Sequence, residues 1–147
     1  MKKNCYIVFS LLLATVFAGC KNQATTSIPS TKVELEFNIL NENLNAPGTV
    51  ATFIKPRYSN EYVGYGGVVF FHNFDDSFAA YDLACPNEVD PQVRLNVDSI
   101  VGEAICPKCG AVFDIGYARG YPVQGDCKYI MRPYRISVSG YDVRVYN

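Results

Sequence analysis

The chain has 147 residues, with thirteen Lys and Arg against fourteen Asp and Glu, and a formal net charge of −1. This length suits one compact domain. No cluster of basic residues stands out, so the composition argues against a nucleic acid partner. The chain contains one histidine and six cysteines, which are the side chains best suited to bind soft or borderline metals.

Residues 1–19 have the three-part layout of a signal peptide. Lys2 and Lys3 precede an apolar run over residues 6–18, which is too short to span a bilayer comfortably. The run ends in VFAGC, and this small-small-Cys ending resembles the lipobox of bacterial lipoproteins. The resemblance implies cleavage before Cys20 and attachment of a diacylglycerol to its thiol, with palmitate among the acyl chains. The alternative is an ordinary secretory signal in which Cys20 is incidental.

Residues 20–31 are expected to form the lipidated N-terminus and a polar tether, because KNQATTSIPSTK is low in complexity. The membrane is then a partner through lipid alone, because no second apolar stretch is long enough for a membrane-spanning helix. Lys21 stands where an Asp would favour the inner membrane, so we expect the outer membrane of the cell envelope. Without Lys2 and Lys3 the chain has eleven basic and fourteen acidic residues, a net charge of −3.

Residues 32–147 predict an all-β domain, a small sandwich or barrel, with no stretch of helical periodicity. Alternation over residues 32–39 predicts a half-buried strand with one apolar face, formed by Val33, Leu35, Phe37 and Ile39. A hairpin turn is expected at residues 73–76 and a bend at 139–140. Further strands are expected over residues 49–54, 67–73, 77–85, 93–97, 100–106 and 111–115, and in a terminal hairpin over 134–147. Loops are expected over residues 41–48, 58–67 and 116–126.

Four cysteines remain once Cys5 leaves with the signal and Cys20 carries lipid: Cys85, Cys106, Cys109 and Cys127. They can form two disulfides, which an oxidising compartment outside the cytoplasm favours. They can also form one tetrathiolate metal site.

The stretch CPKCG at residues 106–110 favours metal. Two cysteines separated by two residues can direct both sulfurs at one atom, and this spacing suits soft metals. Gly110 permits the positive φ that such a turn needs. A catalytic dithiol of the thioredoxin type is disfavoured, since a predicted strand follows the turn where a helix N-terminus would be needed. The nearby acids would also oppose thiolate formation; they are Glu103, Asp114 and Asp126.

The wider pattern over residues 48–147 resembles the Rieske iron–sulfur family. That family has C-x-H in one loop, C-x-x-H-G-x-x-F-D in another, then G-x-P-x-x-G-P-A and a closing hairpin. Cys85 and Cys106 stand at the two thiolate positions. The other matching residues are Gly110, Phe113, Asp114, Gly120, Pro122, Gly125, Tyr134 and Val138. The resemblance implies a Rieske-like fold with a cysteine-bearing loop tip.

The chain departs from the family where the histidines should be. Asn87 and Cys109 occupy those positions, and the only histidine, His72, lies earlier on a predicted strand. A cluster with two histidine ligands is therefore impossible on residue count. Where the family has G-P-A, this chain has GDC, so that Cys127 enters the loop that would cover the cluster.

Three outcomes stay open for Cys85, Cys106, Cys109 and Cys127: a single Zn or Fe ion, an all-thiolate [2Fe–2S] cluster, or two disulfides with no metal. The first two predict a membrane-anchored electron-transfer or metal-binding module, with a redox protein as a possible partner. The third predicts a structural or binding lipoprotein. No catalytic residue is predicted in any of these cases, since nothing near His72 suggests a nucleophile.

Overall fold

The computed structural model describes residues 24–117 and 119–147. In this part of the chain it contains eleven β-strands and no helix, which confirms the predicted all-β class. None of its described segments is a helix that is long and apolar enough to cross a membrane. The predicted signal peptide and Cys20 lie outside the described residues.

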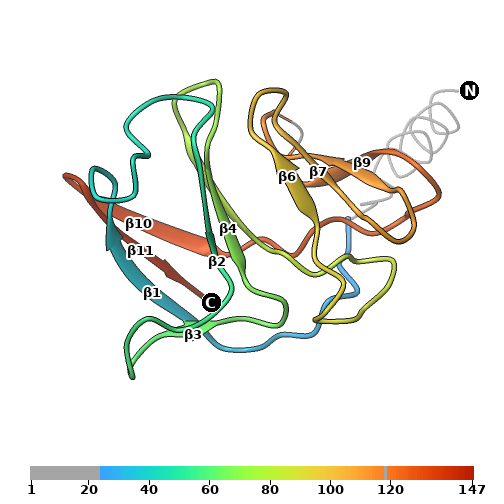
Figure 1. The fold of residues 1–147 in the computed structure, drawn as a ribbon, viewed down its shortest axis with the longest axis horizontal. Coiled ribbons are helices and arrows are strands. Elements are labelled where there is room, and N and C mark those ends of the chain that lie inside the picture. The colour runs from blue at the N-terminus through green and yellow to red at the C-terminus, as the bar shows by residue number, and fades with distance from the viewer. Residues whose placement is uncertain (1–23, 118) are drawn as a thin grey trace, which may run out of the picture.

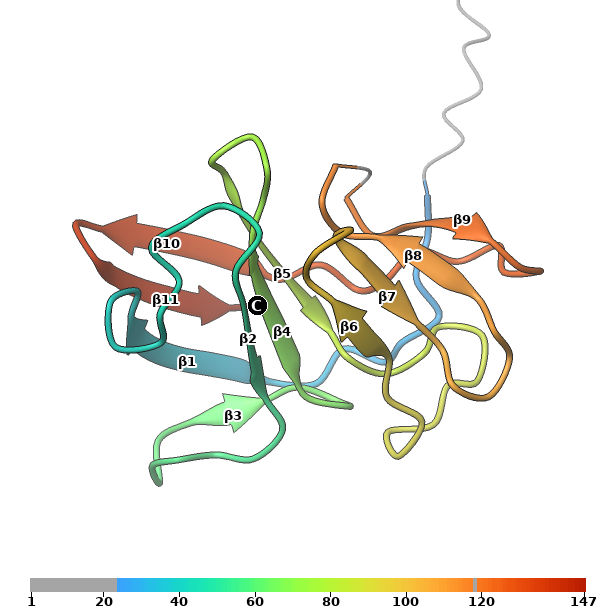
Figure 2. The same ribbon diagram turned by 45° about the horizontal axis from the view of Figure 1, so that its top comes forward.

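The strands form three antiparallel sheets, seen from two directions in Figures 1 and 2. The base sheet has the order β10 (Arg135–Ser139), β11 (Asp142–Tyr146), β1 (Val33–Asn38), β3 (Tyr62–Val63). The middle sheet has the order β2 (Val50–Phe53), β4 (Val68–His72), β5 (Phe78–Asp82). The third has the order β6 (Asn96–Asp98), β7 (Glu103–Ile105), β8 (Val112–Asp114), β9 (Tyr121–Gln124). We call residues 83–131, which contain this third sheet, the cysteine lobe.

The middle sheet separates two apolar cores. Along β4, Val68 and Phe70 belong to the base core with β1 and β11, whereas Val69 and Phe71 belong to the core of the cysteine lobe. All five residues of β4 are buried for this reason. A strand covered on both faces needs an unbroken apolar run, which explains why VVFF does not alternate.

Most of the predicted strands are confirmed. The apolar face of β1 is buried as expected, with Val33 and Leu35 exposed by 1% and 0%. The turn at residues 73–76 closes with a hydrogen bond from the Asn73 amide to the Ser77 carbonyl, 2.8 Å. Two strands were not predicted, β3 and β9, which lie inside stretches expected to be loops. Both are short and irregular in pattern, so their pairing partners rather than their own residues define them.

A buried carboxylate lies where the middle sheet leads into the cysteine lobe. Asp82, at the end of β5, is 0% exposed. Its oxygens accept hydrogen bonds from the Tyr134 hydroxyl at 2.5 Å and from the amides of Tyr65, Gly66 and Ala84 at 2.8–3.0 Å. Because this strand end leads directly to Cys85, the Asp82 network fixes where the first cysteine loop begins.

The segment 24–31, within the predicted tether, is packed against the fold. Ile28 is 1% exposed, and its carbonyl accepts a hydrogen bond from the Arg132 guanidinium at 2.9 Å. The Ile130 amide donates to the Thr25 carbonyl at 3.1 Å, and the Ser27 hydroxyl donates to the Pro86 carbonyl. This segment therefore contacts the first cysteine loop and the chain that follows β9.

Candidate metal centre

The first cysteine loop, residues 83–95, connects β5 to β6 and buries Cys85 completely. The Cys85 amide donates to the Val93 carbonyl at 3.0 Å, and the Cys85 carbonyl accepts from the Val89 amide at 3.0 Å. Val89 takes a positive φ of 51° to complete this turn. The amide and the carbonyl of Cys85 are thus both hydrogen-bonded, which fixes the backbone position from which its side chain extends.

The second cysteine loop, residues 106–111, connects β7 to β8. The Cys106 amide donates to the Ala111 carbonyl at 2.9 Å, and the Gly110 amide returns to the Cys106 carbonyl at 3.1 Å. Gly110 has a φ of +71°, as the sequence predicted for the residue after the second cysteine. This tight turn presents Cys106 and Cys109 on the same side of the loop.

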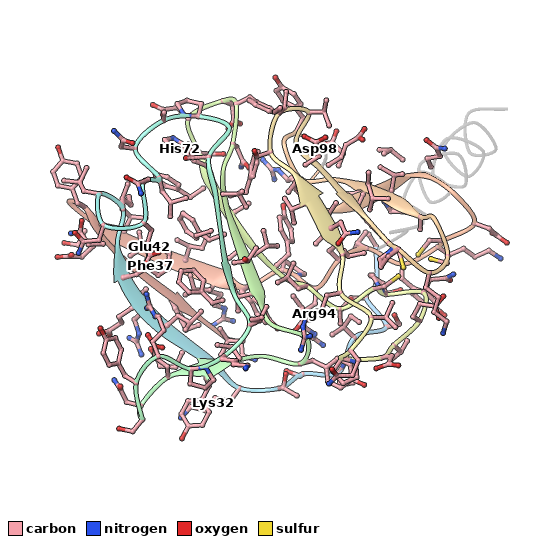
Figure 3. The ribbon with its side chains drawn as sticks, viewed as in Figure 1. Lys32, Phe37, Glu42, His72, Arg94 and Asp98 are labelled. Atoms are coloured by element: carbon pink, nitrogen blue, oxygen red, sulfur yellow. The ribbon has the colours of Figure 1, made fainter. Side chains whose placement is uncertain are left out.

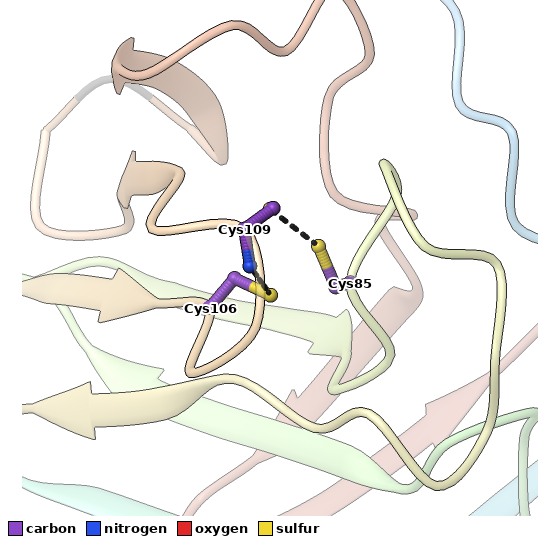
Figure 4. Close-up of side chains that lie close together, drawn as sticks. All are labelled: Cys85, Cys106 and Cys109. Atoms are coloured by element: carbon purple, nitrogen blue, oxygen red, sulfur yellow. Dashed lines mark hydrogen bonds between the residues drawn. The ribbon is translucent and has the colours of Figure 1, made fainter.

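Three sulfurs from the two loops converge (Figure 4). The Sγ atoms of Cys85, Cys106 and Cys109 all lie within 4.8 Å of one another. The Sγ atoms of Cys85 and Cys109 are 3.7 Å apart, and the Cys109 amide donates to the Cys106 sulfur at 3.5 Å. Cys85 and Cys106 are buried and Cys109 is half-buried, so Cys109 is the most accessible of the three to solvent.

Burial and hydrogen bonding set the three thiols apart. Burial, with the adjacent Cys106 thiol, raises the pKa of Cys85 to about 12, although the amides of Asn87 and Glu88 act in the opposite direction. Burial also raises the pKa of Cys109, but donors from Ala111, Cys106, Cys85 and Asn87 together lower it below the ordinary value. Donors directed at sulfur stabilise thiolates, which are the form that binds metal.

Polar contacts attach the first cysteine loop to the second loop and to the segment before β4. Lys108, between the cysteines of the second loop, forms an ion pair with Glu88 of the first loop at 2.5 Å. The Tyr65 hydroxyl donates to the Val89 carbonyl at 3.0 Å and so attaches the first loop to the segment before β4. Sequence analysis missed both contacts, and no local pattern could have shown them, because each joins residues at least twenty positions apart.

Cys127 is not a member of the three-sulfur group. Its thiol donates to the Tyr129 carbonyl at 3.5 Å, and its side chain packs against the same core as Cys109. Burial raises its pKa, with added contributions from Cys109, Asp126 and Cys106. Cys127 therefore lies in the neighbourhood of the group, and its role as a fourth ligand stays a prediction.

His72 makes contacts that leave no free ring nitrogen for a metal. Nδ1 lies 2.8 Å from the Leu44 carbonyl oxygen, and Nε2 lies 2.8 Å from an Asp76 carboxylate oxygen. Figure 3 shows His72 well separated from the sulfurs. Asn87 and Cys109 stand at the two positions where the Rieske pattern has histidine. Asn87 is exposed and lies beside Cys109.

Comparisons with known proteins support the fold alone. No family model matches the chain, and no curated protein matches it in sequence. Among solved structures, it is similar to a chain of the complex of reduced oxygenase and oxidised ferredoxin in carbazole 1,9a-dioxygenase. That similarity has a TM-score of 0.53 at 18% identity and covers 79% of this chain and 94% of the other.

Two further structures extend this comparison. The plasma membrane Rieske protein PetC3 from Synechocystis PCC 6803 has a TM-score of 0.53 at 19% identity, over 78% of this chain and 97% of the other. The quaternary ammonium Rieske monooxygenase CntA has a TM-score of 0.54 at 15% identity, over 81% of this chain but only 31% of that protein. The chain therefore has a Rieske-type fold, which confirms the expectation from its cysteine loops.

The Rieske cluster itself does not fit the side chains present. It requires two neutral imidazoles on one iron. The chain has one histidine, and both of its ring nitrogens contact oxygen atoms of Leu44 and Asp76. What the two cysteine loops supply is sulfur, and any group held here must be one that thiolates can bind.

Proposed function

We propose that this protein is a non-enzymatic metal-binding module that holds a metal or iron–sulfur centre through cysteine thiolates, with electron transfer as its role if the bound metal is iron, since zinc has no redox chemistry. The observation that carries the proposal is the convergence of three sulfurs, from Cys85, Cys106 and Cys109, within 4.8 Å of one another. Thiolate ligands select soft and borderline metals, zinc and iron among them. A likeness to a ferredoxin–oxygenase complex supports a redox protein as the partner.

Cys127 is proposed as the ligand that completes the centre. A closed structural site needs four donors, and this thiol packs against the same core as the other three. The Cys127→Ser variant should retain metal with weaker affinity, whereas Cys109→Ser should lose it. Equal affinity of Cys127→Ser and the unaltered chain, measured by competition with a chromophoric chelator, would remove Cys127 from the ligand set.

The proposal includes an N-terminal lipid on Cys20, which would attach the domain to the cell envelope, the outer membrane in particular. Its support is the sequence VFAGC after an apolar run. Intact mass of protein extracted from membranes tests this point: a chain beginning at Cys20 with the added mass of acyl chains is expected. A chain cleaved elsewhere, or without acyl chains, contradicts the anchor.

An alternative function follows from the 3.7 Å separation of the Cys85 and Cys109 sulfurs, since two thiols so close can also be oxidised to a disulfide. The protein would then be a structural or binding lipoprotein without metal. Metal analysis and thiol counting on anaerobically purified protein decide between the two. Stoichiometric metal supports the proposed function; absence of zinc and iron, with two mapped disulfides, supports the alternative.

A further inference from the structure

One pair among the three sulfurs is separated as two corners of a single tetrahedral metal site would be. With zinc–sulfur bonds of about 2.3 Å at tetrahedral angles, two thiolates on one ion are separated by about 3.8 Å. The Cys85 and Cys109 sulfurs are 3.7 Å apart, and Cys106 lies within 4.8 Å of both. One ion placed among the three would need only small side-chain adjustments to reach all of them.

A two-iron cluster requires a different arrangement. Its terminal ligands point away from each other on two irons, so sulfurs on different irons are separated by the whole width of the cluster core. Three cysteines on such a cluster cannot all be neighbours, because at least one must bind the second iron. In the Rieske pattern Cys109 takes the position of a ligand to the second iron, yet its sulfur lies 3.7 Å from that of Cys85.

The surrounding contacts hold the sulfurs close together. The Lys108–Glu88 ion pair draws the second cysteine loop onto the first, and the Cys109 amide donates directly to the Cys106 sulfur. The packed segment 24–31 contacts the first loop through the hydrogen bond from the Ser27 hydroxyl to the Pro86 carbonyl. Widening the gap to admit a two-iron core would require these loops to separate.

We propose that the centre is mononuclear: one divalent zinc or iron ion per chain, in tetrahedral geometry, with Cys85, Cys106 and Cys109 as three of its ligands. This inference rests on the proposed function, because it assumes that the cysteines bind metal. It departs from the cofactor that the Rieske-type fold implies, and the reason lies in the replacement of two imidazoles by thiolate-bearing and amide side chains.

The test compares two reconstitutions of the full mature chain under strictly anaerobic conditions. One sample receives zinc, and the other receives ferrous iron with sulfide, which gives a cluster every chance to form. Metal and acid-labile sulfide are then counted per chain, and cobalt is substituted to record ligand-field bands. His72→Gln is the matched control, since His72 lies outside the sulfur group and should leave the metal content unchanged.

One metal per chain, no bound sulfide and a tetrahedral cobalt spectrum that disappears in Cys109→Ser are the expected results. Two irons with two sulfides per chain would overturn the mononuclear centre while leaving the proposed metal-binding function in place. No metal in either sample would overturn both. The two failures are therefore distinguishable in one set of measurements.

A second, independent observation concerns the side of the protein that faces the membrane. The described chain begins at Ala24 and is attached at once to the cysteine lobe, through Thr25 to Ile130 and through Ser27 to Pro86. From Cys20 to Ala24 an extended chain reaches about 14 Å at most. We infer that a lipid on Cys20 places the cysteine lobe, and not the base sheet, against the bilayer surface.

Single tryptophans can test this orientation cleanly, because the chain contains none. Tyr129→Trp reports on the cysteine lobe next to Ile130, and Tyr141→Trp reports on the β10–β11 turn at the far end of the molecule (Figure 1). Both tyrosines are exposed, by 42% and 59%, so both positions should tolerate the change. The lipidated variants are placed in vesicles whose lipids carry bromine near the headgroup.

Quenching of Tyr129→Trp several-fold stronger than that of Tyr141→Trp is expected. The difference should vanish when a long Gly-Ser linker is inserted between Gln23 and Ala24, and when Cys20→Ala prevents lipidation. Equal quenching at both positions in a chain with lipid on Cys20, or a mature chain without that lipid, would overturn the inference. The metal content of the same samples tests the proposed function separately.

Discussion

The base sheet and the cysteine lobe differ in the length of their strand pairing and in the contacts that stabilise them. In the base sheet, β1 pairs with β11 and β10 with β11 over five residue pairs each, above a core rich in phenylalanine. In the cysteine lobe, β6, β7 and β8 pair over only three residues each, and β8 is irregular against β9. The comparison teaches that the base sheet can hold its shape through packing, whereas the cysteine lobe depends more on what joins its loops.

Removing the metal should therefore have the largest effect, and it should be local. Structural zinc sites contribute roughly 10 kcal/mol or more to the folding of small domains. After treatment with a chelator, amides of Glu103–Ile105 and Val112–Asp114 should exchange with deuterium much faster, while those of β1 and β11 change little. Exchange that rises equally in both regions would show that the two are not separate in stability.

A matched pair of core truncations sharpens the same comparison. Phe70 lies in the base core and Phe113 in the core beneath the cysteines, and both are 0% exposed. In metal-bound protein, Phe70→Ala and Phe113→Ala should each cost about 3–5 kcal/mol of unfolding free energy. In metal-free protein only Phe70→Ala should keep that cost, because the core around Phe113 is then already loosened. Denaturant unfolding with and without metal measures both, and an equal cost in all four cases would contradict the division.

Loss of the Tyr134 hydroxyl should lower both the stability of the fold and its affinity for metal. Tyr134→Phe removes the 2.5 Å hydrogen bond to buried Asp82, which should cost about 2–3 kcal/mol and weaken metal binding, since Asp82 positions the strand that leads to Cys85. Tyr141→Phe is the control, because Tyr141 is exposed. Loss of stability without any change in metal affinity would limit Asp82 to a structural role.

A smaller effect is expected from the ion pair beside the base sheet, and it should depend on pH. Arg57 contacts the buried carboxylate of Glu61 at 2.7 Å. Burial raises the pKa of Glu61, but hydrogen bonds from Arg57 outweigh it and lower the pKa below 4.5. Glu61→Gln should therefore cost about 1–2 kcal/mol at neutral pH.

The pH dependence gives this prediction its sign. A carboxylate with a lowered pKa in the folded state stabilises the protein above the unfolded value, and this contribution is lost as the pH falls. The difference between Glu61→Gln and the unaltered chain should shrink as the pH drops below 4.5, the ordinary value for Glu. Metal content should stay the same in both. A difference that is constant from neutral to acid pH would contradict the assigned pKa direction.

The sequence by itself determined the fold class and the chemistry available. Alternation in β1, the unbroken apolar run of β4 and the turn at residues 73–76 are local patterns, and each reflects a physical preference of a few neighbouring residues. The count of one histidine by itself excludes a two-histidine cluster. The CPKCG spacing was sufficient to predict the turn and the positive φ of Gly110.

Only the tertiary structure decided which sulfurs meet and at what distance. Cys85 and Cys109 are 24 residues apart, and their 3.7 Å separation depends on Asp82, Tyr65 and the Lys108–Glu88 pair, whose partners are remote in sequence. The packing of Ile28 in the expected tether is of the same kind, since it depends on a surface created by distant segments. Such contacts leave no periodic trace in the sequence, because each is fixed by the folding of the whole chain.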